Sequence, residues 1–460
     1  MPTYLDVAAV RIQQYIARTP ALRLRRGASW LLSTATSPDS VLEQFTGTGL
    51  GIARNRDAGD ADGIVALTVD RHAERQAAEH VMLYLRELLP AVELQAVWAT
   101  ADSYLDAYPA LAAQRSRPLV SMPPQADFSL GTTCEKCRVD LRIAGGAMCE
   151  DCLARDRGAG RRDFGVDKAE DGAEDASATE RAVLDGVTKR RSVQLRPVRH
   201  FEDLARLGSV QGNRNHVATV ALDGNGMGAF FAALAHTGNT VLKRHISPAI
   251  SAATREALTA ATAGIIRPND RRLPVIAHVA GGDDVVVSVV ADRAWTFVDG
   301  FQRAFSNELK KFRLPTDVRV EMPSMSAGVV FAHQKFPYAR AVRLADDMLR
   351  KAKQDTQGAQ AAVCWLNVTE DGEQAPAWRR AFTCDELEGH ADAVKAIADL
   401  GNTGRQTLQR LLSTGTEEEI TAAVLSWARR NGHTEIRRLS GHLDIDDMRG
   451  LAAYTRWARP

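Results

Sequence analysis

Two apolar runs, VIAHVA and VVVSVVA, flank the four residues GGDD at 281–284, and this arrangement constrains the fold more than any other feature of the chain. Both runs are rich in valine, and β-branched residues favour strands. Glycine and aspartate between two short apolar runs are typical of a hairpin turn. The sequence therefore predicts a β-hairpin whose turn carries two adjacent acids, Asp283 and Asp284.

Alternating strand and helix patterns surround this hairpin. Residues 216–223 and 324–334 are predicted strands, and residues 227–236, 248–266, 293–312 and 338–354 are predicted helices. This order predicts an antiparallel sheet with helices on one face. Residues 3–10, 63–69 and 93–100 are predicted strands of a smaller α/β domain near the N-terminus, and the chain beyond about Asp385 is predicted to be almost wholly helical.

Composition narrows the class of protein. The 460 residues suggest about three domains, and an apolar content of 45% with 25% charged residues is enough to fill several cores. The formal net charge of +1 excludes a global basic field that would bind nucleic acid unspecifically. No stretch approaches the roughly 20 apolar residues of a membrane span, and the N-terminus lacks the pattern of a signal peptide. We therefore expect a cytoplasmic protein without membrane contact.

Four of the six cysteines form two CxxC pairs, Cys134 with Cys137 and Cys149 with Cys152. Two such knuckles at this spacing present four thiolates to one tetrahedral Zn²⁺ ion. A closed four-thiolate site leaves no position for substrate, so we expect a structural role; a degenerate or redox pair is the alternative. Cys364 and Cys384 are predicted to be ordinary, partly buried thiols.

Asp223 closes an apolar strand and is followed by GNGMG, a backbone that can approach a phosphate closely. If the GGDD hairpin pairs with this strand, the carboxylates of Asp223, Asp283 and Asp284 converge at one edge of the sheet. Nucleotidyl transfer uses such carboxylates to hold two divalent cations, and oxygen ligands suit Mg²⁺ or Mn²⁺. The plain alternative is that DGNG and GGDD are ordinary turns. Their order together with the following strand and helix favours the enzyme.

These residues also carry a family resemblance. The run SMSAGVVFAHQKFPYARAVRLADDMLRKAK, after DGNGMG and GGDD, resembles the catalytic palm of the large polymerase-like subunit of type III CRISPR effector complexes and, more distantly, the GGDEF diguanylate cyclases. The stretch IQQYIARTPALRLRRGASWLLS resembles the opening of the first, non-catalytic palm of that subunit, and a cysteine module between two palms matches its layout. The likeness covers most of residues 1–370.

The resemblance implies an α+β fold: two ferredoxin-like polymerase/cyclase palm domains with a zinc-binding insert and an all-α C-terminal domain. The expected boundaries are 1–120 for the first palm, 125–156 for the zinc module, 157–195 for a charged flexible linker, 196–375 for the catalytic palm and 376–460 for the helical domain.

The resemblance also implies roles for particular residues. Asp223, Asp283 and Asp284 match the catalytic, metal-binding acids of the family, and Lys353 matches a lysine that meets the triphosphate. A solvated helix lysine is the alternative for Lys353. The residues expected to bind nucleotide are Gly224, Asn225, Gly226, Gly281, Gly282, Ser326 and Lys353.

The function that follows is a nucleotidyltransferase that converts ATP or another nucleoside triphosphate into a cyclic oligonucleotide messenger in CRISPR-type antiphage defence. Its expected cofactors are two Mg²⁺ or Mn²⁺ ions and one structural Zn²⁺. The alternative is a non-catalytic scaffold subunit that binds nucleotide or RNA. For the C-terminal helices we expect contacts with small subunits of a larger complex, with homodimerisation as the alternative.

Three departures from the family pattern shape these expectations. Asn225 stands where the family often has a second acid, which predicts a looser metal site. The first palm has no GGDD, so we expect it to pack against the second palm and help enclose two nucleotides. No nuclease domain or His-Asp pair precedes it, so we expect no DNase activity.

Two basic clusters are predicted to be solvated surface, with contact to RNA as the alternative. They comprise Arg18, Arg23, Arg25 and Arg26, and Lys189, Arg190 and Arg191.

Overall fold

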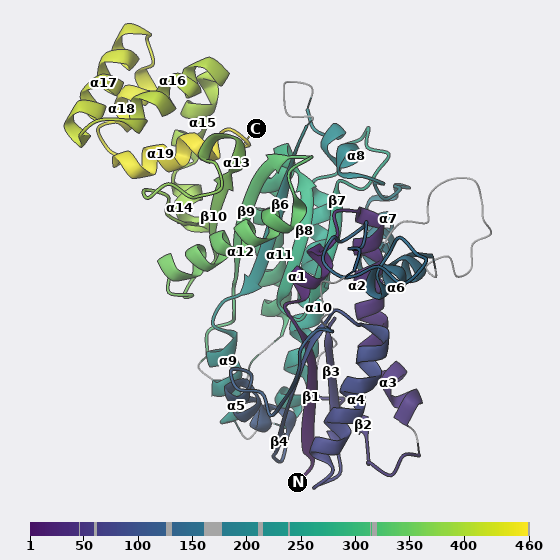
Figure 1. Cartoon of the computed structure of the whole chain (residues 1–460). Helices are drawn as coiled ribbons and strands as arrows, with labels where there is room; N and C mark the ends of the chain where they lie inside the picture. The colour runs from purple at the N-terminus through teal and green to yellow at the C-terminus, as the bar shows by residue number, and fades with distance from the viewer. Residues whose placement is uncertain are drawn as a thin grey trace.

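A computed structural model describes residues 1–45, 47–58, 62–125, 131–160, 177–209, 215–237, 240–312, 314 and 320–458 (Figure 1). Its first sheet has the strand order β2-β3-β1-β4-β5, in which every paired neighbour is antiparallel. The elements of this first domain are β1 (Thr3–Val10), α1 (Ile12–Ala17), α2 (Leu22–Ala35), α3 (Pro38–Phe45), β2 (Ala53–Arg54), β3 (Ile64–Val69), α4 (Glu74–Leu88), β4 (Glu93–Thr100), α5 (Tyr104–Gln114) and β5 (Val120–Met122).

The second sheet contains the predicted hairpin. Its strand order is β11-β10-β9-β6-β8-β7, and β6 pairs antiparallel with both β8 and β9. Its elements are β6 (His216–Gly224), α9 (Met227–Ala235), α10 (Thr240–Gly264), β7 (Val275–Gly281), β8 (Asp284–Val290), η3 (Ala291–Arg293), α11 (Ala294–Lys311), β9 (Met325–His333), α12 (Tyr338–Asp355), β10 (Ala362–Asn367) and β11 (Phe382–Thr383). The predicted strands and helices of this region are confirmed.

Two expectations about this sheet were wrong. The sheet is not wholly antiparallel, because β10 runs parallel to β9. Helices also cover both of its faces: Val220 packs in the core that contains α10 and α11, whereas its neighbour Ala221 packs in the core that contains α12. Successive strand residues point to opposite faces, so β6 is buried on both sides.

The two α/β domains share a core. Val7 of β1 and Leu67 of β3 lie in the same buried apolar cluster as Val286 of β8 and Met348 of α12. The first domain therefore packs directly against the second, as expected from its lack of a GGDD turn.

Residues 125–195 connect the two domains. The cysteines lie before and at the start of α6 (Glu150–Gly160), which packs on α2. A flexible linker was predicted for 157–195, but α7 (Ala178–Arg191) is a helix packed on α10, with Val187 fully buried. The prediction was wrong there because the segment is rich in charged residues, so its composition gave no sign of a buried helix face. Residues 161–176 of the predicted linker lie outside the described residues. The short helix α8 (Phe201–Arg206) follows.

The C-terminal region is helical, as predicted. It consists of α14 (Cys384–Gly389), α15 (Ala391–Asp399), α16 (Gly401–Ser413), α17 (Glu417–Arg430), α18 (Thr434–Leu439) and α19 (Ile445–Tyr454), preceded by the single turn α13 (Val368–Asp371). The second sheet nevertheless reaches into the interval predicted for this domain, because Phe382 of β11 pairs with Val363 of β10. Across the described ranges of the chain, no helix is long and apolar enough to cross a membrane.

The prediction of solvated basic clusters holds for Arg23, Lys189, Arg190 and Arg191, which are exposed, and is wrong for Arg25 and Arg26. Arg25 and Arg26 are 2% and 3% exposed, respectively, and Arg26 donates to both carboxylate oxygens of Glu180 in α7, at 2.8 and 2.7 Å. Arg18 pairs with Asp140 of the cysteine module, and Arg191 donates to the Ala263 carbonyl at 3.0 Å. These arginines join parts of the molecule that are distant in sequence.

Candidate active site at the GGDD hairpin

The hairpin turn lies beside the end of β6. Leu222 of β6 pairs with Val285 of β8, and Gly281 pairs with Asp284 across a two-residue turn. Gly282 has φ = 61°, a conformation that favours glycine, and its carbonyl accepts a hydrogen bond of 2.7 Å from Thr254 of α10. The expected pairing of the hairpin with the Asp223 strand is confirmed, and it fixes the turn next to Asp223.

Gly224 provides the space for one of the acids. A Cβ atom added to this residue would lie 2.6 Å from Oδ2 of Asp283. The Asp283 carboxylate thus rests on the backbone that follows Asp223, and a residue with a side chain would displace it. Glycine is therefore required at position 224 for the Asp283 carboxylate to lie this close to the backbone.

The acids are crowded and only partly exposed to water. Burial, followed by the charge of Asp223, raises the pKa of Asp283 to about 6. Burial also raises the pKa of Asp284 well above its usual range, with further contributions from Asp223, Asp283 and Asp346. Carboxylates in this situation are costly to ionise unless cations lie among them.

One cation comes from the protein. Nζ of Lys353 donates to Oδ2 of Asp223 and, at 2.7 Å, to the Gly224 carbonyl. Lys353 lies near the end of α12, which approaches β9 closely at Gly328: a Cβ atom there would overlap the backbone of Ala345 and Leu349. Lys353 is therefore not a freely solvated helix lysine, and small residues on β9 help bring it to the acids.

Three residues that the sequence analysis missed also reach this cluster. Gln13 of α1 donates from Nε2 to Oδ2 of Asp284 at 2.8 Å, so the first domain contacts the acids directly. Asp346 lies seven residues before Lys353 on α12 and raises the pKa of Asp284; this spacing of two helical turns was a usable signal. The charge of Asp283 is among the causes that raise the pKa of Tyr108 on α5, after burial.

Two side chains predicted to bind nucleotide make hydrogen bonds inside the protein. The Asn225 amide nitrogen donates to Oγ of Ser324 at 2.8 Å and to the Gln360 carbonyl at 2.9 Å. The Ser326 hydroxyl is fully buried and accepts from the backbone N–H of Ala362 at 3.3 Å. The structure therefore gathers Asp223, Asp283, Asp284 and Lys353, together with the glycines at 224, 281 and 282, while Gly226 (φ = 66°) begins α9.

The acids fit divalent cations by chemistry. They offer hard oxygen ligands, the donors that Mg²⁺ and Mn²⁺ prefer, and a bound cation would offset the burial and mutual repulsion that raise the pKa of Asp283 and Asp284 despite Lys353. The three acids do not form a compact cage: within the described ranges, the four cysteines are the only group of three or more His, Cys, Asp or Glu side chains whose ligand atoms all lie within 4.8 Å of one another.

Those cysteines fit one zinc ion. Four thiolates at about 2.3 Å around a tetrahedral Zn²⁺ would lie about 3.8 Å apart. Sγ of Cys137 and Sγ of Cys149 are 3.7 Å apart, and all four cysteines are buried. Backbone N–H groups of Lys136 and Cys152 donate to Sγ of Cys134 and Cys149, both at 3.4 Å, as is suitable for thiolates.

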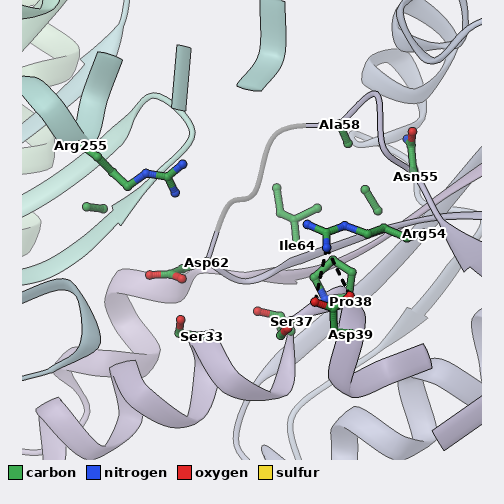
Figure 2. Close-up of a pocket in the computed structure, with 13 residues that line it drawn as sticks. Ser33, Ser37, Pro38, Asp39, Arg54, Asn55, Ala58, Asp62, Ile64 and Arg255 are labelled. Atoms are coloured by element: carbon green, nitrogen blue, oxygen red, sulfur yellow. Dashed lines mark hydrogen bonds and ion pairs between the residues drawn. The ribbon is translucent and has the colours of Figure 1, made fainter. Parts of the chain in front are cut away.

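A polar pocket of about 270 Å³ lies at the junction of the two domains beside the hairpin. Figure 2 shows Arg255 of α10 extending toward the residues of the first domain, among them Asp62. Ala280, which directly precedes Gly281, also lines the pocket. Asn55 is 4% exposed, and its amide nitrogen has no hydrogen-bond partner in the described part of the chain. The remaining lining residues are Ser33, Thr36, Ser37, Pro38, Asp39, Arg54, Ala58, Ile64 and Ala66.

Comparison with known proteins agrees with the fold. Residues 216–362 match the family model for the second palm domain of Cas10/Cmr2. No curated protein matches the sequence. Csm1 from T. onnurineus aligns with a TM-score of 0.61 at 13% identity, covering 99% of this chain and 69% of that one.

Two further solved structures align equally well. A chain of the Csm1-Csm4 subcomplex of the type III-A CRISPR-Csm interference complex gives a TM-score of 0.60 at 14% identity, over 99% of this chain and 69% of its own. The Csm1-Csm4 cassette in complex with pppApA gives 0.60 at 14% identity, over 100% and 69%. The resemblance to the large subunit of type III CRISPR complexes and the α+β fold with two palms are therefore confirmed.

Proposed function

We propose that this chain is a metal-dependent nucleotidyltransferase that joins nucleoside triphosphates, with ATP as the first candidate, into a cyclic oligonucleotide within a CRISPR-type defence complex. The observation that carries the proposal is the convergence of Asp223, Asp283 and Asp284, with raised pKa values at the two hairpin acids, beside Lys353. A plain turn has no need of acids held in this way.

In the proposed reaction, a ribose 3′-hydroxyl attacks the α-phosphorus of a second triphosphate. A new P–O bond forms, the bond to the pyrophosphate breaks, and the hydroxyl proton is released. Two Mg²⁺ or Mn²⁺ ions, held by the three aspartates, would lower the pKa of the hydroxyl and neutralise the leaving pyrophosphate. Lys353 is placed to exchange its contact with Asp223 for the triphosphate, and the backbone at 224–226 lets phosphate approach.

The pocket of Figure 2 supports a second nucleotide. It is lined from both domains, and it offers Arg255 and Arg54 to phosphate. The amide nitrogen of Asn55, which has no partner among the described residues, is available to a base or ribose. Solved Csm1-Csm4 cassettes of similar fold hold pppApA and cA4. By analogy with these relatives, we propose that this chain uses adenine nucleotides and binds partner subunits. We propose a cytoplasmic location on the same basis.

The test is to incubate the purified protein with each triphosphate, singly and mixed, with Mg²⁺ or Mn²⁺. Products are identified by mass spectrometry beside Asp283→Ala/Asp284→Ala. A cyclic product that is lost in the variant supports the proposal and identifies the base. If neither the protein nor its complex with partner subunits forms a product under any condition, the catalytic proposal is wrong.

One observation favours a second candidate, a scaffold subunit that binds nucleotide without turning it over. The Asn225 amide faces internal acceptors, so this position supplies no charge to the metals. Metal-dependent thermal stabilisation by ATP separates the two: a catalytic palm requires it and loses it in Asp283→Ala. Stabilisation by ATP that persists in Asp283→Ala favours the scaffold.

A further inference from the structure

A second pocket of about 530 Å³ lies at the other end of β6 and α12 from the acids. It is formed where the start of α2, the start of α8, β6 and the β9–α12 connection meet, so both domains contribute to it. Its walls are mostly apolar and aromatic: Pro20, Ala21, Leu22, Phe201, Val217, Ala332, Phe336, Pro337, Tyr338 and Ala341.

Arg25 lines this pocket and is only 2% exposed. Its guanidinium lies over the ring of Phe201 at 4.8 Å and over the ring of Tyr338 at 4.1 Å. Nη2 donates to the Pro20 carbonyl, but Nε and Nη1 have no acceptor among the residues that the structure describes. The aromatic rings cover its faces, and the two unpartnered nitrogens are buried in the wall of the pocket.

The charge of Arg25 has no acidic partner either. The adjacent Arg26 shows the usual solution, a buried ion pair with Glu180, whereas no described ion pair involves Arg25. His278 packs against Tyr338, and burial together with the two arginines lowers its pKa well below the usual range, so it is neutral. A buried cation without a counter-charge is costly, and an anionic ligand would remove that cost.

The polar residues around Arg25 add to this preference. His200, His333 and Lys335 line the pocket against one acid, Glu202. A phosphate has three acceptor oxygens and can accept from Arg25 and from these side chains together, which a carboxylate with two oxygens does less well, and the volume lies within the range of small-molecule sites.

We propose that this pocket binds a small phosphate monoester with an aromatic body, a nucleoside monophosphate in size, whose phosphate meets the edge of Arg25. The pocket is separate from the GGDD site and does not depend on its activity. Because the lining comes from both domains, bound ligand would stabilise their junction and raise the unfolding temperature.

The experiment measures binding of AMP and of inorganic phosphate by calorimetry and thermal unfolding, without added divalent metal. Lys353→Ala serves as the background, which removes the cation of the GGDD site. Arg25→Met is compared with Arg23→Met, a matched change on the same helix at an arginine that is 53% exposed. We expect AMP to bind, Arg25→Met to weaken it at least about ten-fold, and Arg23→Met to leave it unchanged.

Other outcomes are decisive as well. Adenosine, which lacks the phosphate, should not bind; if it binds as well as AMP, the proposal is wrong. Equal binding of benzoate would mean a carboxylate site, such as one for an acidic side chain of a partner protein, and would overturn the phosphate assignment. If Arg25→Met does not fold, Lys335→Glu at the exposed rim decides, because unchanged AMP binding there refutes the proposal.

Discussion

Replacing Gly224 by alanine tests the GGDD site with a single methyl group. The added Cβ would lie 2.6 Å from Oδ2 of Asp283 and 2.6 Å from Cγ of Met227. Ordinary contacts begin at 3.4 Å, so the Asp283 carboxylate must move by about 0.8 Å. Oδ2 of Asp283 is the end of a side chain that can rotate, and Met227, which must shift by a similar amount, is a flexible side chain. The free energy of unfolding should therefore change by no more than about 1 kcal/mol.

The substitution should instead lower the rate of the reaction. Mg²⁺ requires oxygen ligands at about 2.1 Å in near-octahedral geometry, and a misplacement of about 1 Å can lower a rate about 100-fold. We therefore expect Gly224→Ala to lower the rate of product formation about 100-fold and to weaken Mn²⁺ binding, while the unfolding temperature stays close to that of the wild type.

Gly228→Ala is the matched control. Gly228 lies in α9, and a Cβ atom there meets nothing within 4 Å. The assays are mass spectrometry of nucleotide products and titration with Mn²⁺. If Gly224→Ala keeps its rate within about three-fold of the wild type, while Asp283→Ala is inactive, the reasoning from the Asp283 position is refuted.

Three further predictions concern stability and metal content. Glu180→Ala leaves Arg26 buried without its counter-charge and should lower the free energy of unfolding by about 3–5 kcal/mol in denaturant titrations; a loss below about 1 kcal/mol would contradict a packed α7. Burial raises the pKa of Asp6 to about 6, so folded Asp6 keeps a proton that unfolded Asp6 releases near pH 4. The free energy of unfolding of the wild type should therefore fall by up to about 3 kcal/mol as the pH rises from about 4 to about 6. Asp6→Asn should flatten this fall in unfolding measured against pH, and an unchanged slope would show that other groups cause it. Cys137→Ser should abolish binding of one zinc ion per chain, measured by metal analysis, whereas Cys364→Ser should not; full zinc content in Cys137→Ser would exclude the four-thiolate site.

The sequence alone determined most elements of the two α/β domains. The strands around GGDD and the helices at 293–312 and 338–354 have strong local patterns, because apolar period and turn chemistry depend on residues close in the chain. The cysteine module was likewise predictable from spacing, since two tight knuckles define their own ligands.

The sequence analysis failed where a residue's environment comes from distant segments. The charged run around α7 suggested a linker, because its buried positions, such as Val187, become apparent only when α10 packs against it. Arg25 and Arg26 were predicted to be solvated for the same reason, as Glu180 lies 154 residues from Arg26.

The candidate site shows the same division. Asp223, Asp283 and Asp284 could be identified from their motifs, and their convergence depended only on whether the hairpin paired with β6. The contact of Gln13 with Asp284 spans 271 residues and has no local signal. The local sequence pattern thus determined which acids form the site. Only the packing of one domain on the other decided how far these acids are buried, how their pKa values shift and which side chain of the first domain contacts them.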